Sequence, residues 1–395
     1  MTGRRRRGRS QAGGSVVRSQ RERKHHRGSL VLFGFSVCLL AGLSGCAVPA
    51  NSSPPGPSGK PDWVSLGSPD FSPGTIAFPS LAVSNGTPYV AFADGTNGSK
   101  ATVMEYNGTS WVDVGSPDFS PGAVNFVSLA VSNGTPYVAF ADLANSGKAT
   151  VMKYDGTSWV NVGSPDFSPG TVEFISFVVY SGIPCVALED DVNGNKATVM
   201  GFSGTNWVDV GSPDFSAGPS GSLSLVVSDG TPSVAFTDNA NGDMATAMEY
   251  NGTNWVDAGN PDFSAGSAYY ISLAVSHGAR YVAFEDAADG YRETVMQYNG
   301  LIWASVGNPD FSAGQSEYGS LVVDGDTPYV AYEDDANGSG ANVMRYNGSS
   351  WVNVGSPDFS PGAADAFSLV VSNGTPYIAF RDIADGSKVT VMAFK

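Results

Sequence analysis

Residues 110–157 read SWVDVGSPDFSPGAVNFVSLAVSNGTPYVAFADLANSGKATVMKYDGT, and this 48-residue unit decides the fold. Close copies of it fill the chain from residue 62 to residue 395 without an insertion or a deletion. A fixed period of this length is typical of repeat architectures, in which one unit cannot bury its hydrophobic faces alone. The seven tryptophans mark the register, each 48 residues after the one before: Trp63, Trp111, Trp159, Trp207, Trp255, Trp303 and Trp351.

Each unit contains four short runs rich in Val, Thr, Tyr and Phe, separated by residues that favour turns. In the quoted unit these runs are residues 126–132, 136–142, 148–154 and 158–163. The Asn-Gly pair at 133–134 tolerates the positive φ angles of a type I′ hairpin, so the first two runs are expected to be antiparallel. The runs are too short for helices and show no helical periodicity. The sequence therefore predicts an all-β fold of seven four-stranded meanders.

The two ends of the repeat region predict how the meanders are arranged. The region begins with a fourth-strand sequence, residues 62–67, and ends with a third-strand sequence, residues 388–395. Pairing of these two segments closes a ring and removes an exposed strand edge. The longest connection, as at residues 67–74, suits a link from the outer strand of one unit to the inner strand of the next. Residues 62–395 are therefore predicted to form a seven-bladed β-propeller, closed by its N-terminal strand.

The turn between the third and fourth strands carries the motif Tyr-x-Gly-x-x-Trp, as in Tyr106, Gly108 and Trp111. This motif resembles the Tyr and Trp portion of kelch repeats, and the resemblance implies a kelch-like propeller. The kelch Gly-Gly doublet at the end of the second strand is missing. Lectin propellers with Trp-containing repeats are a second resemblance, without an extended shared motif. Residues 155–159 (DGTSW) approach the sialidase Asp-box but lack its Ser-x-Asp spacing.

Residues 1–45 are predicted to be a secretory leader. Their ten Lys and Arg residues precede an apolar run at 30–43, which is too short to span a bilayer as a helix. The sequence that follows, Leu43-Ser44-Gly45-Cys46, resembles the lipobox of bacterial lipoproteins. The resemblance implies cleavage before Cys46, attachment of a diacylglycerol to Cys46 and a place on the extracytoplasmic side of the cell membrane. An ordinary signal peptide or a short uncleaved anchor is the alternative.

Residues 46–61 are rich in Pro, Ser and Gly and predict a flexible tether between the anchor and the propeller. The formal net charge of the chain is -16, but residues 1–45 hold ten basic residues and one acidic residue, so the remainder carries -25. So acidic a body would repel phosphate, and nucleic-acid binding is not expected. Cys185 is the one cysteine after Cys46, so no internal disulfide is expected. We expect a monomer that touches the membrane through its lipid only.

Residues repeated in every unit are expected to serve the fold. The tryptophans could stack on sugars or pack against the neighbouring blade, and their strict period favours packing. Two aspartates also recur, one in the long connection and one after the second strand, and both should lie at the same end of the propeller. They suggest either Ca²⁺ binding or the capping of turns, and the lack of Asp-x-Asp-x-Asp spacing favours capping. The two series are Asp70, Asp118, Asp166, Asp214, Asp262, Asp310 and Asp358, and Asp94, Asp142, Asp190, Asp238, Asp286, Asp334 and Asp382.

Positions that differ between the units predict the binding site. The four residues just after each long connection diverge, although the copies are alike elsewhere. From these segments we predict five binding residues: Asn125, Glu173, Tyr269, Glu317 and Asp365. Four further side chains, which precede the second aspartate, are expected at the same end: Glu189, Glu285, Glu333 and Arg381. The alternative explanation is that these segments form solvent-exposed loops, in which sequence changes accumulate without a functional cause.

Catalysis has little support in the sequence. His277 is the one histidine after residue 62, and it occupies a hairpin turn at the opposite end from the variable segments. No catalytic residue and no metal ligand is assigned, and Ca²⁺ is the one cofactor considered. The sequence thus predicts a surface-anchored, non-catalytic propeller that binds an extracytoplasmic glycan. A protein-interaction scaffold is one alternative, and a carboxylate-based glycosidase or lyase using Glu173, Glu317 and Asp365 is another.

Overall fold

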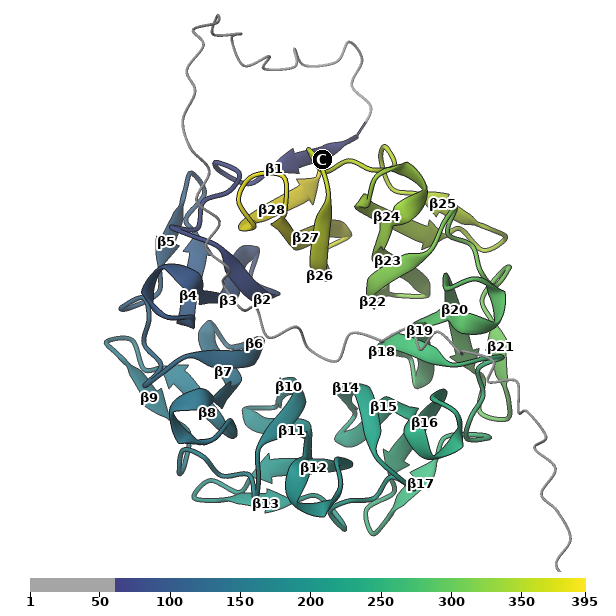
Figure 1. The fold of residues 1–395 in the computed structure, drawn as a ribbon, viewed down its shortest axis with the longest axis horizontal. Helices are drawn as coiled ribbons and strands as arrows, with labels where there is room; N and C mark the ends of the chain where they lie inside the picture. The colour runs from purple at the N-terminus through teal and green to yellow at the C-terminus, as the bar shows by residue number, and fades with distance from the viewer. Residues whose placement is uncertain (1–60) are drawn as a thin grey trace, which may run out of the picture. The chain divides into compact units, whose positions relative to one another are not determined.

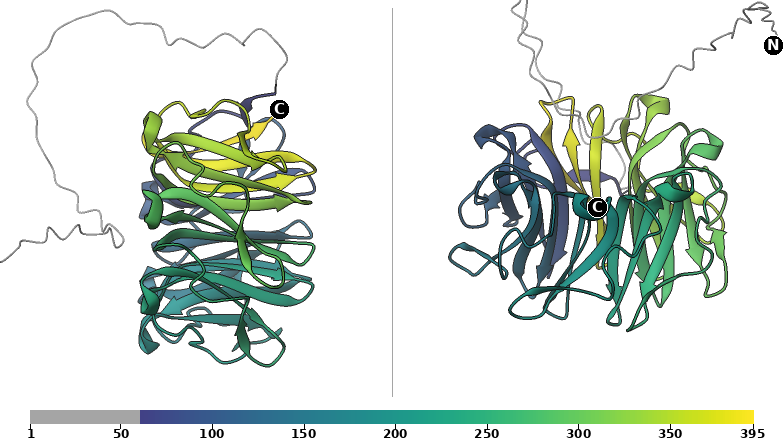
Figure 2. Two further views of the ribbon diagram at one scale, coloured as in Figure 1. Left: turned by 90° about the vertical axis from the view of Figure 1, so that its right-hand side faces the viewer. Right: turned by 60° about the horizontal axis from the view of Figure 1, so that its bottom comes forward.

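The computed structural model describes residues 61–395, which form seven four-stranded antiparallel sheets arranged around an axis (Figure 1). This arrangement confirms the predicted seven-bladed β-propeller. The predicted leader, lipid site and tether lie outside the described residues. Within residues 61–395, no helix is long and apolar enough to cross a membrane. The helical turns are single 3-10 turns, which lie along one face of the propeller in side view (Figure 2).

Each sheet follows the predicted order from the axis outward. The inner strands are β2 (Ile76–Ser84), β6 (Val124–Ser132), β10 (Val172–Tyr180), β14 (Ser220–Ser228), β18 (Ala268–Ser276), β22 (Ser316–Asp324) and β26 (Ala364–Ser372). The second strands are β3 (Thr87–Asp94), β7 (Thr135–Asp142), β11 (Ile183–Asp190), β15 (Thr231–Asp238), β19 (Ala279–Asp286), β23 (Thr327–Asp334) and β27 (Thr375–Asp382). Each blade is named below by its inner strand.

The outer half of each blade is equally regular. The third strands are β4 (Lys100–Tyr106), β8 (Lys148–Tyr154), β12 (Lys196–Phe202), β16 (Met244–Tyr250), β20 (Arg292–Tyr298), β24 (Gly340–Tyr346) and β28 (Lys388–Phe394). The outer strands are β1 (Trp63–Ser65), β5 (Trp111–Asp113), β9 (Trp159–Asn161), β13 (Trp207–Asp209), β17 (Trp255–Asp257), β21 (Trp303–Ser305) and β25 (Trp351–Asn353). Six 3-10 turns separate the second and third strands: η1 (Gly95–Asn97), η2 (Leu143–Asn145), η3 (Asp191–Asn193), η4 (Asn239–Asn241), η5 (Ala287–Asp289) and η6 (Asp335–Asn337).

The ring closes through the strand at the start of the repeat region, as predicted. Strand β1 pairs antiparallel with β28, with Trp63 opposite Phe394 and Ser65 opposite Met392. The β26 blade is therefore built from both ends of the repeat region, in the order β1-β28-β27-β26. This pairing covers the outer edge of β28 and gives the blade its fourth strand, as in the other six blades.

An indole at every blade junction joins the outer strands. The Nε1–H of Trp111 donates to the Leu66 carbonyl, which follows the outer strand of the preceding blade, at 2.7 Å. The same ring stacks on Phe71 of the connecting link, with centroids 4.6 Å apart. All seven tryptophans make both contacts. The packing interpretation is thus confirmed, because these rings are buried between blades.

A second ring of contacts joins the inner strands near the axis. The Leu129 N–H donates to the Oγ of Ser80, on the inner strand of the preceding blade, at 3.0 Å. The equivalent bond occurs at all seven junctions; its partners are 49 residues apart at six of them and 287 residues apart at the junction that closes the ring. These serines give a partner to backbone groups that the inner edge of each sheet would otherwise leave unpaired.

We predict that deletion of residues 62–67 lowers the melting temperature by at least about 5 °C. The deletion removes β1, the buried Trp63 ring and the indole bond to the Val354 carbonyl, so the outer edge of β28 becomes exposed. Differential scanning calorimetry measures the effect against a control chain that begins at residue 61. An unchanged transition would contradict the proposed role of β1 in closure.

Candidate functional site

The aspartates after the second strands cap the turns that follow them. The Oδ1 of Asp94 accepts a hydrogen bond from the Thr96 N–H, two residues on, at 2.9 Å. The same bond occurs in every blade, and all seven carboxylates are buried, with exposed fractions of 0% to 4%. Turn capping therefore accounts for the recurrence of this aspartate.

The aspartates of the long links lie at the same end of the propeller as these caps. Asp118 adopts a φ of 53°, and its N–H donates to the Thr102 hydroxyl of its own blade at 3.0 Å. Among residues 61–395, no group of three or more His, Cys, Asp or Glu side chains is arranged to hold a metal ion. Calcium binding stays a hypothesis from the sequence.

The five predicted binding residues occupy equivalent places at this same end. Each is the second residue of its inner strand, and each lies opposite the next-to-last residue of the second strand. The pairs are Asn125 with Ala141, Glu173 with Glu189, Tyr269 with Glu285, Glu317 with Glu333, and Asp365 with Arg381. The four additional side chains predicted at this end are thus the direct cross-strand partners of four of the candidates.

Sequence reasoning missed the residue that follows each candidate. A register shift interrupts every inner strand here, and the shifted residue takes a positive φ, for example 51° at Tyr270. Such a bulge brings two consecutive side chains to one part of the surface, where a regular strand would alternate them. The signal was present as an aromatic residue in five of the seven units: Phe78, Phe126, Phe174, Tyr270 and Tyr318. These aromatic rings pair across neighbouring blades, with Tyr270 and Tyr318 at 4.8 Å between centroids.

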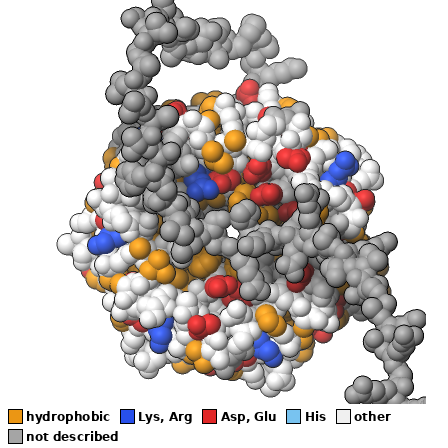
Figure 3. All heavy atoms as spheres, viewed as in Figure 1, with side chains coloured by type: hydrophobic (Ala, Val, Ile, Leu, Met, Phe, Trp, Pro, Cys, Tyr) orange, Lys and Arg blue, Asp and Glu red, His pale blue; other side chains and the backbone are white. Residues whose placement is uncertain are grey.

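The acidic side chains are not distributed evenly around the axis. They concentrate in three consecutive blades, β18, β22 and β26, where they meet three tyrosines and one arginine. Figure 3 shows acidic side chains gathered near the centre of this face, with a basic side chain beside them. We call this group the axial site, and its members are Tyr269, Tyr270, Glu285, Glu317, Tyr318, Glu333, Asp365 and Arg381.

Burial and the repulsion of neighbouring carboxyls raise the pKa values of two axial carboxyls, Glu285 and Glu333. The pKa of Glu285 rises to about 8, first because the group is buried and then because Glu317 and Glu293 lie nearby. The pKa of Glu333 rises to about 7, again mainly by burial, with further contributions from Glu317 and Asp365. Near neutral pH these two groups therefore hold protons for part of the time and act as both donors and acceptors.

One ion pair orders the β26 side of the axial site. The Nε of Arg381 donates to the Oδ1 of Asp365 at 2.7 Å, and its Nη2 donates to Oδ2 of the same carboxylate. This two-bond contact raises the pKa of Arg381 and fixes the plane of its guanidinium group. Between the β18 and β22 blades, the Tyr270 hydroxyl donates to the Oε2 of Glu317 at 3.4 Å. The structure thus brings Tyr269, Glu317 and Asp365 to adjacent blades.

The other two predicted residues lie in different blades. Asn125 belongs to the β6 blade and Glu173 to the β10 blade, so neither is next to the three acidic blades. Glu173 is exposed, whereas its partner Glu189 is buried and accepts a hydrogen bond from the Ser220 hydroxyl of the next blade at 3.1 Å. Burial raises the pKa of Glu189 to about 8.

A buried glutamate lies behind the axial site. Glu293 on β20 is opposite Glu285, is 1% exposed, and its Oε1 has no hydrogen-bond partner. In the other blades this place holds Ala or Val, for example Ala245. Space for the carboxyl comes from Gly319 of the next blade, because a Cβ there would lie 2.8 Å from Glu293 Oε1. Every other blade has a larger apolar residue or proline in the place of Gly319, for example Ile271.

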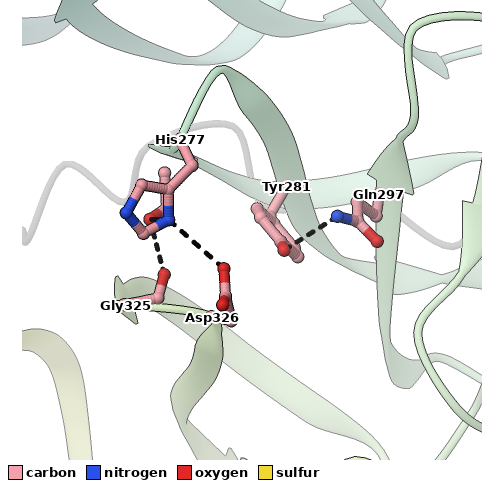
Figure 4. Close-up of polar contacts among 6 residues, drawn as sticks. His277, Tyr281, Gln297, Gly325 and Asp326 are labelled. Carbon is pink, nitrogen blue, oxygen red and sulfur yellow. Dashed lines mark hydrogen bonds and ion pairs between the residues drawn. The ribbon is translucent and has the colours of Figure 1, made fainter.

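The opposite face carries a smaller set of irregular residues. His277 lies in the hairpin turn between β18 and β19, as predicted, and its Nδ1 is 3.2 Å from Asp326 Oδ1 (Figure 4). On the same face, Ser233 replaces the tyrosine found at this place in most blades and borders a cavity of about 510 Å³. The guanidinium of Arg280 reaches Ser233 Oγ at 3.2 Å and forms an ion pair with Glu249. The Arg280 side chain is thus bonded to two side chains of the preceding blade.

Comparison with known proteins supports the fold. No protein-family model and no curated protein matches the chain. Among solved structures, an ulvan lyase has a TM-score of 0.53 at 11% identity, covering 83% of this chain and 95% of its own. The Trypanosoma rangeli sialidase has a TM-score of 0.51 at 11% identity, covering 85% of this chain. The chain spans 60% of that sialidase, while YjhT matches over 99% of its own length at a TM-score of 0.50 and 13% identity. At such identities the likeness concerns the propeller fold alone.

We predict that Glu293→Ala combined with Gly319→Ile stabilises the protein, whereas Gly319→Ile alone destabilises it. The pair recreates the Ala245 and Ile271 contact of the preceding junction, while the single change drives a side chain into the Glu293 carboxyl. Urea unfolding of the natural protein, Glu293→Ala, Gly319→Ile and the double variant measures the difference. Additive effects of the two single changes would contradict the proposed contact.

The stability of the natural protein and that of the double variant should also depend differently on pH. Because burial raises the pKa of Glu293 to about 8, the folded protein binds more protons than the unfolded chain between about pH 5 and pH 8. Stability from this group is therefore complete at low pH and lost as the pH rises towards 8. Between about pH 5 and pH 8, the free energy of unfolding of the double variant is expected to fall by at least about 1 kcal/mol less than that of the natural protein.

Proposed function

We propose that the axial site binds a carbohydrate chain without transforming it. The observation that carries this proposal is the pairing of Tyr270 and Tyr318, two partly exposed rings 4.8 Å apart, among carboxyls and one fixed guanidinium. Neither tyrosine position is uniform among the blades, so the fold itself does not demand these rings. The contrast with the invariant tryptophans, which the blade junctions use, supports a separate role.

The chemistry of a sugar suits this arrangement. A pyranose ring offers an apolar C–H face and a rim of hydroxyl groups, so it requires flat apolar contact and polar groups at the edge. Tyr270 and Tyr318 supply the flat contact. Glu317 and Glu333 accept hydrogen bonds, and Arg381 donates them from a fixed plane.

The solved propellers of similar fold add support. One is the Trypanosoma rangeli sialidase, and another is a polysaccharide lyase bound to a chain of glucuronic acid and sulfated rhamnose. Propellers of this fold therefore accommodate sugars in at least two known proteins. We infer that this chain uses the same kind of scaffold for a glycan-related role.

The geometry favours binding over the carboxylate-based enzyme considered above. Asp365 is held by Arg381, and Glu173 belongs to a blade that is not adjacent to those of Glu317 and Asp365. Glu173 is thus separated from the other two carboxyls and Asp365 is engaged in an ion pair, which supports binding rather than hydrolysis by a pair of carboxyls. A protein ligand is an outcome that the binding experiment below distinguishes.

We propose further that a lipid on Cys46 and the segment 46–61 tether the propeller to the extracytoplasmic side of the cell membrane. The lipobox-like sequence and the basic, apolar leader support this proposal. Such a tether would hold the glycan-binding propeller near the cell surface.

We predict that the full chain binds on a glycan array and that a bound glycan raises its melting temperature. Tyr270→Ala and Tyr318→Ala are expected to weaken that binding at least about tenfold, because each removes part of the flat contact. The matched control is Tyr180→Ala, at the far end of an inner strand, which should bind normally. Calcium in one arm of the array tests the metal hypothesis. Capture of a protein partner through this face, with no glycan bound, would contradict the proposal.

We predict that Cys46→Ala abolishes lipid labelling and moves the protein from the membrane to the soluble fraction. Labelling of bacteria with a fatty acid analogue, followed by detergent phase separation, measures both effects. Cys185→Ala is the control, since this buried thiol is inaccessible in the fold. Persistence of the label after Cys46→Ala would refute the anchor.

A further inference from the structure

We infer that the glycan bound at the axial site carries a protonated amino group, held between the β18 and β22 blades by Glu285 and Glu317. This inference rests on the proposed function and specifies its ligand class as an amino sugar. The ammonium would lie beside the Tyr270 ring, whose hydroxyl already donates to Glu317.

The first support is the gathering of carboxyl groups around Glu285. Glu285 on β19 repels both Glu293 on β20 and Glu317 on β22. Arg292 of the same blade lies opposite Asp286 rather than Glu285, and Arg381, two blades further on, is bonded to Asp365. An acidic glycan would meet repulsion here, whereas a cationic one would relieve it.

The second support is the unpaired carboxyl behind the site. Glu293 is fully buried, and its Oε1 lacks a hydrogen-bond partner. A carboxyl in that state destabilises a fold, and the other junctions avoid it with Ala or Val against a larger apolar residue or proline. The exchange of both partners at this junction alone, Glu293 with Gly319, therefore has no explanation in folding. When both groups are ionised, Glu293 repels Glu285 from behind, and a bound cation would relieve that repulsion.

An ammonium group fits this sector better than a metal ion. Calcium takes six to eight oxygen ligands, and the described residues hold no such cluster. An ammonium has three donors, which match two carboxylates and leave one for water or a sugar oxygen. An aromatic ring at the side adds a cation–π attraction. Tyr270 is placed to provide that ring.

Binding of a cation should release protons from the site. Burial and its acidic neighbours raise the pKa of Glu285 to about 8, so this carboxyl is mostly protonated at neutral pH. A bound ammonium favours the ionised form and lowers that pKa. The titratable groups that face Glu285 are Tyr269 and Tyr270 from β18, Glu293 from β20 and Glu317 from β22. A neutral sugar exerts no such effect.

The test is isothermal titration calorimetry of the full chain with a glucosamine oligosaccharide and its N-acetylated form of equal length. At about pH 6.5 we expect the amino form to bind at least about tenfold more tightly. Repeating the titration in buffers of different ionisation enthalpy should show proton release for the amino form only. In Glu317→Gln and Glu285→Gln, the amino and N-acetylated oligosaccharides should bind with nearly equal affinity.

The controls separate this inference from the proposed function. Glu105→Gln, at the opposite end of a third strand, should keep the tenfold preference. Glu317 is exposed, so its substitution tests the inference even if Glu285→Gln fails to fold. Equal affinity for both oligosaccharides would overturn the amino-sugar inference and leave glycan binding intact. Failure to bind any glycan on the array would overturn both, and a Glu285-dependent stabilisation by CaCl₂ alone would replace the ammonium with a metal ion.

Discussion

The contact between a tryptophan indole and the preceding blade is the constraint on which the propeller depends. Each indole both donates to a backbone carbonyl at 2.7 to 2.8 Å and stacks on a link phenylalanine, so one residue fixes the distance and the angle between two sheets. The serine hydroxyls do the same near the axis, where backbone N–H groups would lack partners. Seven equal junctions, fixed at two radii, leave the sheets one way to close.

This rigid frame explains where variation is tolerated and why it is informative. A change at an indole, a link phenylalanine or an axial serine would disturb a junction. The first residues of the inner strands make no such junction contact. A bulge interrupts the regular hydrogen-bond ladder there. The axial site is therefore a place where side chains differ from blade to blade while the blades themselves stay alike, and it gathers charges that a uniform ring would not.

The axial acids also illustrate a balance between stability and binding. Glu293 with Gly319 replaces an apolar contact by a buried carboxyl and a residue without a side chain, which weakens one junction of seven. The remaining junctions and the β1 closure compensate for it, because they stabilise the same cooperative ring. A repeat protein can thus accept a local loss of stability at one interface while it carries a cluster of acidic side chains at its surface.

The sequence by itself determined the seven blades, the strand order, the closing strand and the structural use of the tryptophans. Those features follow from an uninterrupted period and from turn residues, both of which are local and visible along the chain. It also placed Tyr269, Glu317 and Asp365 at one end. Only the tertiary structure decided that Tyr270 and Tyr318 share that site, because a bulge cancels the expected alternation of side chains. Only the tertiary structure showed that Glu293 lies against Gly319. A contact between two blades has no periodic pattern in the sequence of either strand.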